Sequence, residues 1–215
     1  MARTTVLTKQ QIIQCAFDIA RDKGKKAITI REIGKRLKRS TAPIYTQYSS
    51  IEGIFNDLNV FIKEKLFENT QKERTVSPFL NIGVGFISFV LENKLIYNDF
   101  FLTMDAPLMG SGEKDHTYLD QMKKNPFISI LTDDQIESLL YDMSVYTYGL
   151  ATIICTGADG NNELDYYIKK LERTGNSLTK FYMYSSGKYE EAIELLLKKV
   201  SKHVNIEEVL KWLNY

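Results

Sequence analysis

Apolar residues recur at intervals of three or four along most of the chain, and no stretch alternates apolar and polar residues with the two-residue period of a strand. The first periodic stretch covers about Thr8–Lys23, and its apolar stripe consists of Ile12, Ala16, Ile19 and Ala20. Gln11 lies three residues after Thr8, which is the spacing of a capping box, and Gly24 is suited to end the helix. The pattern predicts an all-α fold that begins with an amphipathic helix.

Two shorter helices joined by a tight turn are expected next. The second helix begins at Thr29, where Glu32 again has capping-box spacing. Its inner face consists of Ile30, Ile33 and Leu37. Residues 38–39 form the turn, and Ser40 is expected to cap a third helix over Thr41–Gln47. This spacing is that of a helix-turn-helix, a motif that places its second helix in the major groove of DNA.

The remaining periodic stretches predict a larger helical bundle. Ser77 and Pro78 have the residue types of an N-cap and a first helical position. Residues 105–114 are rich in Gly, Pro, Ser and Asp and are expected to form a mobile loop. The expected helices are 51–72, 78–93, 95–104 and 133–155, followed by two or three more within 162–186, 188–202 and 206–213. We therefore expect a DNA-binding domain over residues 1–50 and a ligand-binding and dimerisation domain over residues 51–215.

The charge of the chain is unevenly distributed. Residues 1–48 contain eleven Lys or Arg and three Asp or Glu, a net charge of +8, so residues 49–215 carry −7 within the total of +1. A basic head on an acidic body suggests that the head meets a polyanion. A solvated basic face without a partner is the alternative, and charge alone does not decide between them.

Several other classes of protein have little support. The N-terminus has no apolar signal region, and no apolar stretch reaches the roughly 18 residues of a membrane span, so we expect a cytoplasmic protein. The only histidines are His116 and His203, and no known catalytic, phosphate-binding or metal-ligand spacing occurs. Cys15 and Cys155 are interpreted as small buried apolar residues. We expect no enzyme activity, no cofactor and no metal. A helical protein-interaction module and an enzyme without a recognisable motif remain the alternatives. A DNA-binding repressor must lose DNA affinity steeply as the salt concentration rises, whereas neither alternative requires this.

Residues 12–55 resemble the TetR family of bacterial transcriptional regulators. The matching elements are Ala16-Phe17 to Lys23-Gly24, Thr29-Ile30-Arg31-Glu32-Ile33-Gly34-Lys35-Arg36-Leu37, Ser40-Thr41-Ala42-Pro43-Ile44-Tyr45-Thr46-Gln47-Tyr48, Ser50 and Glu52-Gly53-Ile54. They cover about a fifth of the chain and are most specific at the Ser-x-x-x-Ile-Tyr-x-x-Tyr core. The resemblance implies a dimeric repressor with an N-terminal DNA head, a palindromic operator and a variable C-terminal ligand domain.

The chain departs from the family pattern at three positions. Family members usually have Gly-Val in the turn, where this chain has Lys38 and Arg39. Loss of the glycine strains any position with a positive φ, although the turn gains two charges near the phosphates. Ile51 stands where a lysine is common, which removes one phosphate contact. We expect an altered operator preference and retained DNA binding.

The predicted DNA contacts fall into two groups. Side chains expected to touch base edges are Thr41, Ala42, Thr46 and Gln47, with Arg31 reaching guanine or phosphate. Side chains expected to contact the DNA backbone are Thr29, Lys38, Arg39, Tyr45 and Tyr48. The alternative for the two tyrosines is packing within the head, and Lys35 and Arg36 are interpreted as solvated.

The C-terminal part predicts an effector domain in less detail. The helix over 133–155 is apolar on more than one side, with a second stripe at Leu139, Tyr146 and Ile153, so it can face a second subunit as well as its own core. A wholly internal helix is the alternative. Aromatic residues are frequent here, and such residues line pockets for hydrophobic or aromatic small molecules. The candidate pocket residues are Phe86, Phe89, Phe100, Met104, Tyr141 and Tyr146.

Overall fold

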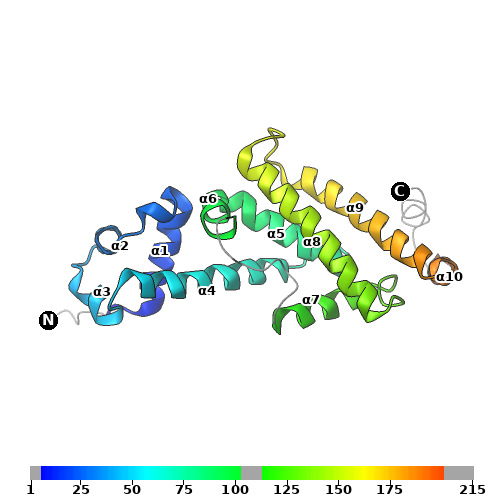
Figure 1. Cartoon of the computed structure of the whole chain (residues 1–215), viewed down its shortest axis with the longest axis horizontal. Coiled ribbons are helices and arrows are strands. Elements are labelled where there is room, and N and C mark those ends of the chain that lie inside the picture. Colours follow the sequence, from blue (N-terminus) through cyan, green and yellow to red (C-terminus); the bar gives the residue numbers. More distant parts are fainter. Residues whose placement is uncertain (1–5, 103–112, 201–215) are drawn as a thin grey trace. The chain divides into compact units, whose positions relative to one another are not determined.

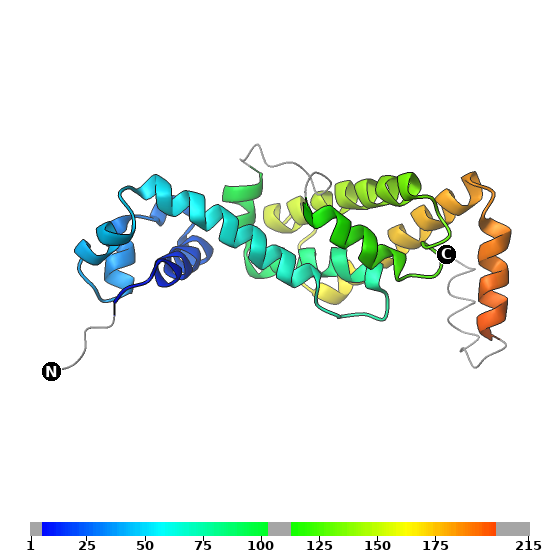
Figure 2. The ribbon, with the colours of Figure 1, turned by 90° about the horizontal axis from the view of Figure 1, so that it is seen from below.

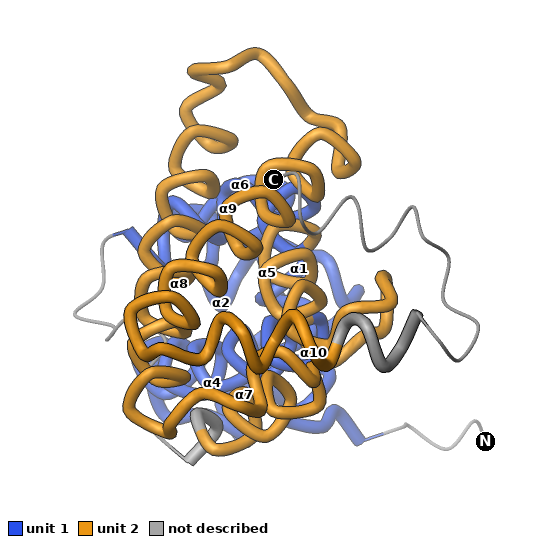
Figure 3. The backbone as a smooth tube through the Cα atoms, turned by 90° about the vertical axis from the view of Figure 1, so that its right-hand side faces the viewer, with its two compact units in different colours: residues 1–69, 89–106 blue, residues 70–88, 107–215 orange. Residues whose placement is uncertain are grey.

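The computed structural model describes residues 6–102 and 113–200, and every regular element in these two ranges is a helix (Figure 1). The all-α prediction is confirmed at this level. The chain divides into two compact units, residues 1–69 with 89–106 and residues 70–88 with 107–215 (Figure 3). The boundary expected after residue 50 therefore falls inside the first unit, which also takes in a later segment of the chain.

The first unit packs its helices around small and branched apolar side chains. It contains α1 (Lys9–Lys23), η1 (Lys25–Ala27), α2 (Ile30–Arg36), α3 (Ala42–Gln47), nearly all of α4 (Ile51–Thr70), the end of α5 (Pro78–Glu92), α6 (Lys94–Ile96) and the π-helix η2 (Tyr97–Phe101). Its fully buried residues include Ile12, Ile19, Ile33, Ile44, Ile54 and Leu58. These six come from α1 to α4, so all four helices contribute buried side chains to the core of this unit.

Local capping explains where the first helices begin. Thr8 caps α1, and its side chain and that of Gln11 make both hydrogen bonds of the predicted capping box. Thr29 caps α2 by accepting from the N–H of Glu32 at 3.1 Å. The second capping box that we predicted is only half formed, because Lys23 binds the Glu32 carboxylate at 2.6 Å.

The prediction for the start of α3 was wrong by one residue. Thr41, not Ser40, occupies the N-cap position, and its side chain makes no capping hydrogen bond. Pro43 lies in the first turn of α3, where its missing N–H would have no partner within the helix. The proline defines this helix start more strongly than the serine does.

The segment after α5 returns to the first unit and packs on α1. The single helix expected over 95–104 is instead the short α6 followed by the π-helix η2, and Met104 lies outside the described residues. Tyr97 and Phe100 of η2 are buried. The Asp99 carboxylate accepts a hydrogen bond from the N–H of Lys25 at 2.6 Å. The Lys25 ammonium lies 5.1 Å from the centre of the Phe100 ring. These contacts join the end of α1 to a segment about seventy residues later in the sequence.

The second unit is built on two long helices that lie side by side (Figures 1 and 2). It contains most of α5, α7 (Glu113–Lys123), α8 (Asp133–Thr156), α9 (Leu164–Ser185) and α10 (Tyr189–Val200). Ser77 accepts from the N–H of Leu80, so the predicted start of α5 is confirmed. The helix α7 was not predicted, because its sequence is mostly polar and buries only a few residues, among them Tyr118 and Met122. Most of the loop expected over 105–114 lies outside the described residues.

The helix α8 has one buried and one exposed face. Thr132 and Gln135 form a complete capping box at its start, and Gly157, with φ 68°, ends it. Its buried face includes Leu140, Met143, Thr147 and Ile154, whereas Tyr141, Val145, Gly149 and Ile153 are exposed. The fold of one chain leaves this uncharged stripe uncovered. It is not the second stripe predicted from the sequence, because Leu139 is buried and Tyr146 is half-buried, and only Ile153 is common to both.

Within the described residues, no individual helix has the length and apolar composition of a membrane span; only α5 taken together with residues 94–101, a pair bent by 100°, meets that criterion.

Candidate nucleic-acid interface

The turn between α2 and α3 is a complete Schellman motif with a lysine at its left-handed position. The N–H of Arg39 donates to the carbonyl of Gly34 at 2.9 Å, and the N–H of Lys38 donates to the carbonyl of Lys35 at 3.1 Å. Both are the hydrogen bonds that define the motif. Lys38 has φ 53°, and no other non-glycine residue in the described ranges has a positive φ. The strain expected from the loss of the family glycine is therefore present at Lys38.

Gly34 gives the turn room to close. A Cβ atom at this position would lie 3.0 Å from the carbonyl oxygen of Arg39 and 3.7 Å from the Ile44 side chain. Ile44 itself is completely buried. The close approach at Gly34 and the buried Ile44 together fix the direction in which α3 leaves the turn.

The helix α3 presents its other side chains to solvent. Ala42, Tyr45 and Thr46 are exposed, the tyrosine to 55%. Thr41 and Gln47 are half-buried. The Thr46 hydroxyl donates to the carbonyl of Ala42 at 3.2 Å, so its oxygen remains an acceptor. Five of the residues predicted to touch DNA thus lie on or directly before one short helix.

Cations around the turn differ in whether they are neutralised. Arg31, Lys35, Lys38 and Arg39 are exposed, and in the described parts of the chain none of these four forms an ion pair. All four lie in α2 or in the turn that precedes α3, with Arg31 in the first turn of α2. These four cations therefore form a group without carboxylate partners in the segment that leads into α3.

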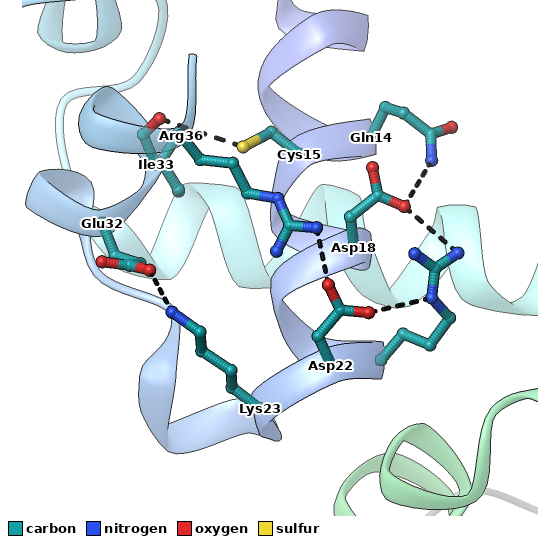
Figure 4. Close-up of polar contacts among 9 residues, drawn as sticks. Gln14, Cys15, Asp18, Asp22, Lys23, Glu32, Ile33 and Arg36 are labelled. Atoms are coloured by element: carbon teal, nitrogen blue, oxygen red, sulfur yellow. Dashed lines mark hydrogen bonds and ion pairs between the residues drawn. The ribbon is translucent and has the colours of Figure 1, made fainter. Parts of the chain in front are cut away.

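Two other cations of the head pair with carboxylates between α1 and α2 (Figure 4). Arg36 binds Asp22 at 2.6 Å, and Lys23 binds Glu32 at 2.6 Å. The hydrogen bond from Arg36 holds the pKa of Asp22 below its usual value, and the one from Lys23 does the same for Glu32. Arg36 was interpreted as solvated, but it serves to join two helices.

Tyr48 and Thr29 are engaged inside the head. Tyr48 is 5% exposed, and its hydroxyl donates to Asp57 at 2.7 Å. Burial raises the pKa of Tyr48 well above its usual value, and the bond to Asp57 adds to this. The Lys9 ammonium lies 4.8 Å from the centre of the same ring. These contacts favour the packing alternative for Tyr48. Thr29 is exposed, although its hydroxyl oxygen already accepts from Glu32.

The five described residues among the six predicted to line a ligand pocket are divided between the two units. Phe89 and Phe100 belong to the first unit, and Phe86, Tyr141 and Tyr146 to the second. The first three of these five are buried, Tyr146 is half-buried and Tyr141 is 55% exposed. Met104, the sixth, lies outside the described residues.

A cavity of about 460 Å³ lies elsewhere in the second unit and is lined by none of these six residues. Its walls come from α5, α8, α9 and the segment around Asn125. Many of the lining residues are small or hydroxylic, including Gly83, Ser144, Thr147, Gly175 and Thr179. The pocket residues predicted from the sequence were mainly aromatic, so the prediction missed this cavity.

Side chains suited to other chemistry are scattered. Cys15 is buried and its thiol donates to the carbonyl of Ile33 at 3.9 Å, while Cys155 is half-buried. Burial raises the pKa of the Cys15 thiol, which makes it a weak nucleophile. His116 is exposed. Within residues 6–102 and 113–200, no three His, Cys, Asp or Glu side chains are grouped so as to hold a metal ion.

The chain matches no protein-family model, no curated protein and no solved structure.

Proposed function

We propose that this chain is a sequence-specific DNA-binding transcriptional regulator that inserts α3 into the major groove. The observation that carries the proposal is the combination of an exposed α3 with unpaired cations around the turn that precedes it. An α-helix with its side chains is about 10–12 Å in diameter, which fits a major groove about 12 Å wide. Unpaired Arg and Lys side chains beside such a helix are placed to bind phosphates on the groove edges. The TetR resemblance of the same residues supports this proposal.

The proposed roles follow from exposure and chemistry. Gln47 and Thr46 read base edges by hydrogen bonds, and Ala42 contacts a thymine methyl group. Lys38 and Arg39 bind phosphates and set the register of the head on the duplex. Further contacts are proposed for Thr41, Tyr45, Arg31 and Thr29.

The regulator is proposed to act as a homodimer that pairs through the exposed stripe of α8. Tyr141, Val145 and Ile153 lie four or eight residues apart on this stripe, with Gly149 between them, and none of these side chains is charged. A second copy of the same helix covers such a stripe and supplies the second head that a palindromic operator needs. Val145→Glu should convert a dimer to a monomer in light scattering, whereas Lys188→Glu, a charge change on a half-exposed ion-paired residue of the second unit, should not. A monomeric wild-type chain would contradict this part of the proposal.

The first experiment is selection of bound sequences from a random duplex pool at physiological salt, where non-specific binding is weak. Enrichment of a two-fold symmetric site is expected. No enrichment with protein shown to be folded would contradict sequence-specific binding and would favour a helical protein-interaction module.

Matched variants then test the residues. Gln47→Ala should cost about 1–3 kcal/mol and relax the preference at one base position. Arg39→Ala should weaken binding to all sequences and lower the slope of log affinity against log salt by about 1. Lys188→Ala removes a cation from the second unit and should leave both unchanged. An equal effect of the three variants would exclude α3 as the reading helix.

The proposed effector is a small molecule that binds the second unit and changes the affinity of the dimer for DNA. Such coupling requires unequal affinity of the ligand for the two states of the regulator.

A further inference from the structure

The cavity of the second unit has an unusual hydrogen-bonding character. Four hydroxyl residues line it, and three of them, Ser144 and Thr147 on α8 and Thr179 on α9, are each at least 95% buried, whereas Ser77 is half-buried. Each of the three buried hydroxyls donates to the backbone carbonyl four residues earlier, at 2.7 Å in all three cases. A hydroxyl has only one proton to donate, and here that proton is already bound to a backbone carbonyl. These oxygens can therefore only accept hydrogen bonds from a molecule in the cavity.

The rest of the lining combines apolar side chains with the half-buried Asn125 and Asn176 and the exposed Lys169 and Glu172. Phe79 and Leu80 of α5 and Phe127 are half-exposed, although most large apolar residues of this unit are buried. Met143 and Leu171 are buried and form further parts of the wall. Half-exposed aromatic and aliphatic side chains around a hollow of about 460 Å³ match the size and composition of small-molecule sites.

Glycines allow the three helices to meet around this hollow. A Cβ atom on Gly83 of α5 would lie 3.2 Å from Leu171 of α9 and 3.6 Å from the Thr147 hydroxyl oxygen of α8. A Cβ atom on Gly175 of α9 would lie 3.3 Å from Phe79. The hydroxyl groups of α8 and α9 therefore face a common space together with the apolar side chains of α5.

We propose that this cavity binds an apolar, ring-containing molecule whose polar group is a hydrogen-bond donor, an amine or a hydroxyl, and that it rejects carboxylates. An N–H or O–H group satisfies the lone pairs of the three hydroxyl oxygens. A carboxylate placed beside the three buried hydroxyls meets oxygens whose protons are already donated to backbone carbonyls, so at that place it loses its hydration without replacement. Glu172 at the rim adds negative charge, and Lys169 beside it adds positive charge at an equally exposed position.

This inference rests on the proposed function only in treating the ligand as the effector. The binding site itself is defined by the second unit, and its test contains no DNA. If the chain binds the probes but no operator, the proposed site stands and the proposed regulator function fails. If it binds an operator but none of the probes, the regulator function stands and the proposed site fails.

The test uses the full chain and three probes with one naphthalene ring each: 1-naphthylmethylamine, 1-naphthylmethanol and 1-naphthoate. Dissociation constants are measured by calorimetry at neutral pH. The amine and the alcohol should bind at least about ten-fold more tightly than the carboxylate, the effect expected from one satisfied against one unsatisfied buried acceptor.

The location is tested by the double variant Thr147→Val with Thr179→Val, which keeps the side-chain shapes and removes two acceptor oxygens. The preference for donors should fall to about three-fold or less, with the helical content unchanged. Ser177→Ala is the matched control, because this exposed hydroxyl on α9 also donates to the carbonyl four residues earlier but does not line the cavity. Failure of all three probes to bind the folded chain would overturn the proposal. Equal or stronger binding of the carboxylate, or an unchanged preference in the double variant, would overturn it as well.

Discussion

Lys38→Gly should stabilise the head, because it removes a side chain from the one left-handed position of the Schellman turn. Lys38 has φ 53°, where the Cβ atom of an L-residue lies too close to the following carbonyl oxygen. The turn holds this conformation through the hydrogen bonds of Lys38 and Arg39 to the last turn of α2. Glycine can adopt the same φ without the steric cost.

The size of the effect is the difference between two opposing terms. A non-glycine residue costs about 1–2 kcal/mol in the left-handed region. Glycine loses about 0.5–1 kcal/mol more conformational entropy on folding. The net stabilisation is therefore about 0.5–1 kcal/mol, which corresponds to a change of about two- to five-fold in an equilibrium constant.

Hydrogen exchange is the suitable assay, since it reports on the head alone within a chain that has two units. The N–H of Leu37 donates to the carbonyl of Ile33 at 2.9 Å and precedes the substituted residue. Its exchange should slow about two- to five-fold in Lys38→Gly when the head opens as a whole.

Two control variants separate the effect of strain from the effect of charge. Lys38→Ala removes the charge and keeps the Cβ atom, so it should leave the rate unchanged. Lys35→Gly places glycine inside α2 and should accelerate exchange, because it destabilises the helix by about 1 kcal/mol.

Equal exchange rates in Lys38→Gly and Lys38→Ala would refute the predicted stabilisation, since they would mean that the steric cost at this position is no larger than the entropy cost of glycine. Faster exchange in Lys38→Gly would mean that chain entropy outweighs the steric term. The two Lys38 variants should lose the same amount of salt-dependent DNA affinity in the proposed function, because both remove the same cation.

Gly34→Ala should lower the free energy of unfolding by about 1 kcal/mol or more, because the added methyl group would lie 3.0 Å from a backbone oxygen of the turn. Thermal melting measures this loss, and Lys35→Ala, at an exposed neighbouring residue, should leave the stability nearly unchanged. Asp99→Ala should accelerate exchange of the Lys25 amide, since the hydrogen bond of 2.6 Å is lost at a cost of about 1–2 kcal/mol, whereas Asp99→Asn keeps an acceptor oxygen and should lose less. Acidification should weaken the contact of α1 with α2, because the pKa values of Asp22 and Glu32 are lowered in the folded head. Their contribution is present above the unfolded pKa values of about 4 and is lost as the pH falls through the lower folded values. Urea titrations from about pH 5 downward should therefore show a smaller loss of stability in Asp22→Asn with Glu32→Gln than in the wild type, and an equal loss would exclude these two pairs as a cause.

Features encoded by neighbouring residues could be predicted from the sequence. The capping box of Thr8, the start of α5 at Pro78 and the end of α8 at Gly157 each depend on a few consecutive residues. Glu32 was assigned to the wrong partner, because its carboxylate binds Lys23, a side chain of α1, at 2.6 Å. A contact between helices has no local signal that a single sequence displays.

Features that depend on packing between distant segments were missed for the same reason. The contact of α6 and η2 with α1 joins residues about seventy positions apart, so the division of the chain could not follow from composition or charge. The cavity is formed by glycines and hydroxyl residues of three helices, and such residues have no periodic apolar pattern. The residues on and before α3, in contrast, were predictable as a group, because one short motif contains them all.

The division of the first unit between residues 1–69 and 89–106 has a consequence for the order of events during synthesis. A ribosome makes the chain from its N-terminus, so α1 to α4 emerge before the segment that binds the end of α1 exists. Until Asp99 is synthesised, the N–H of Lys25 has no carboxylate partner, and the surface of α1 that α6 covers faces water. The nascent head therefore completes its fold only after α5 has been made, and a fragment ended after α4 should remain at that earlier stage.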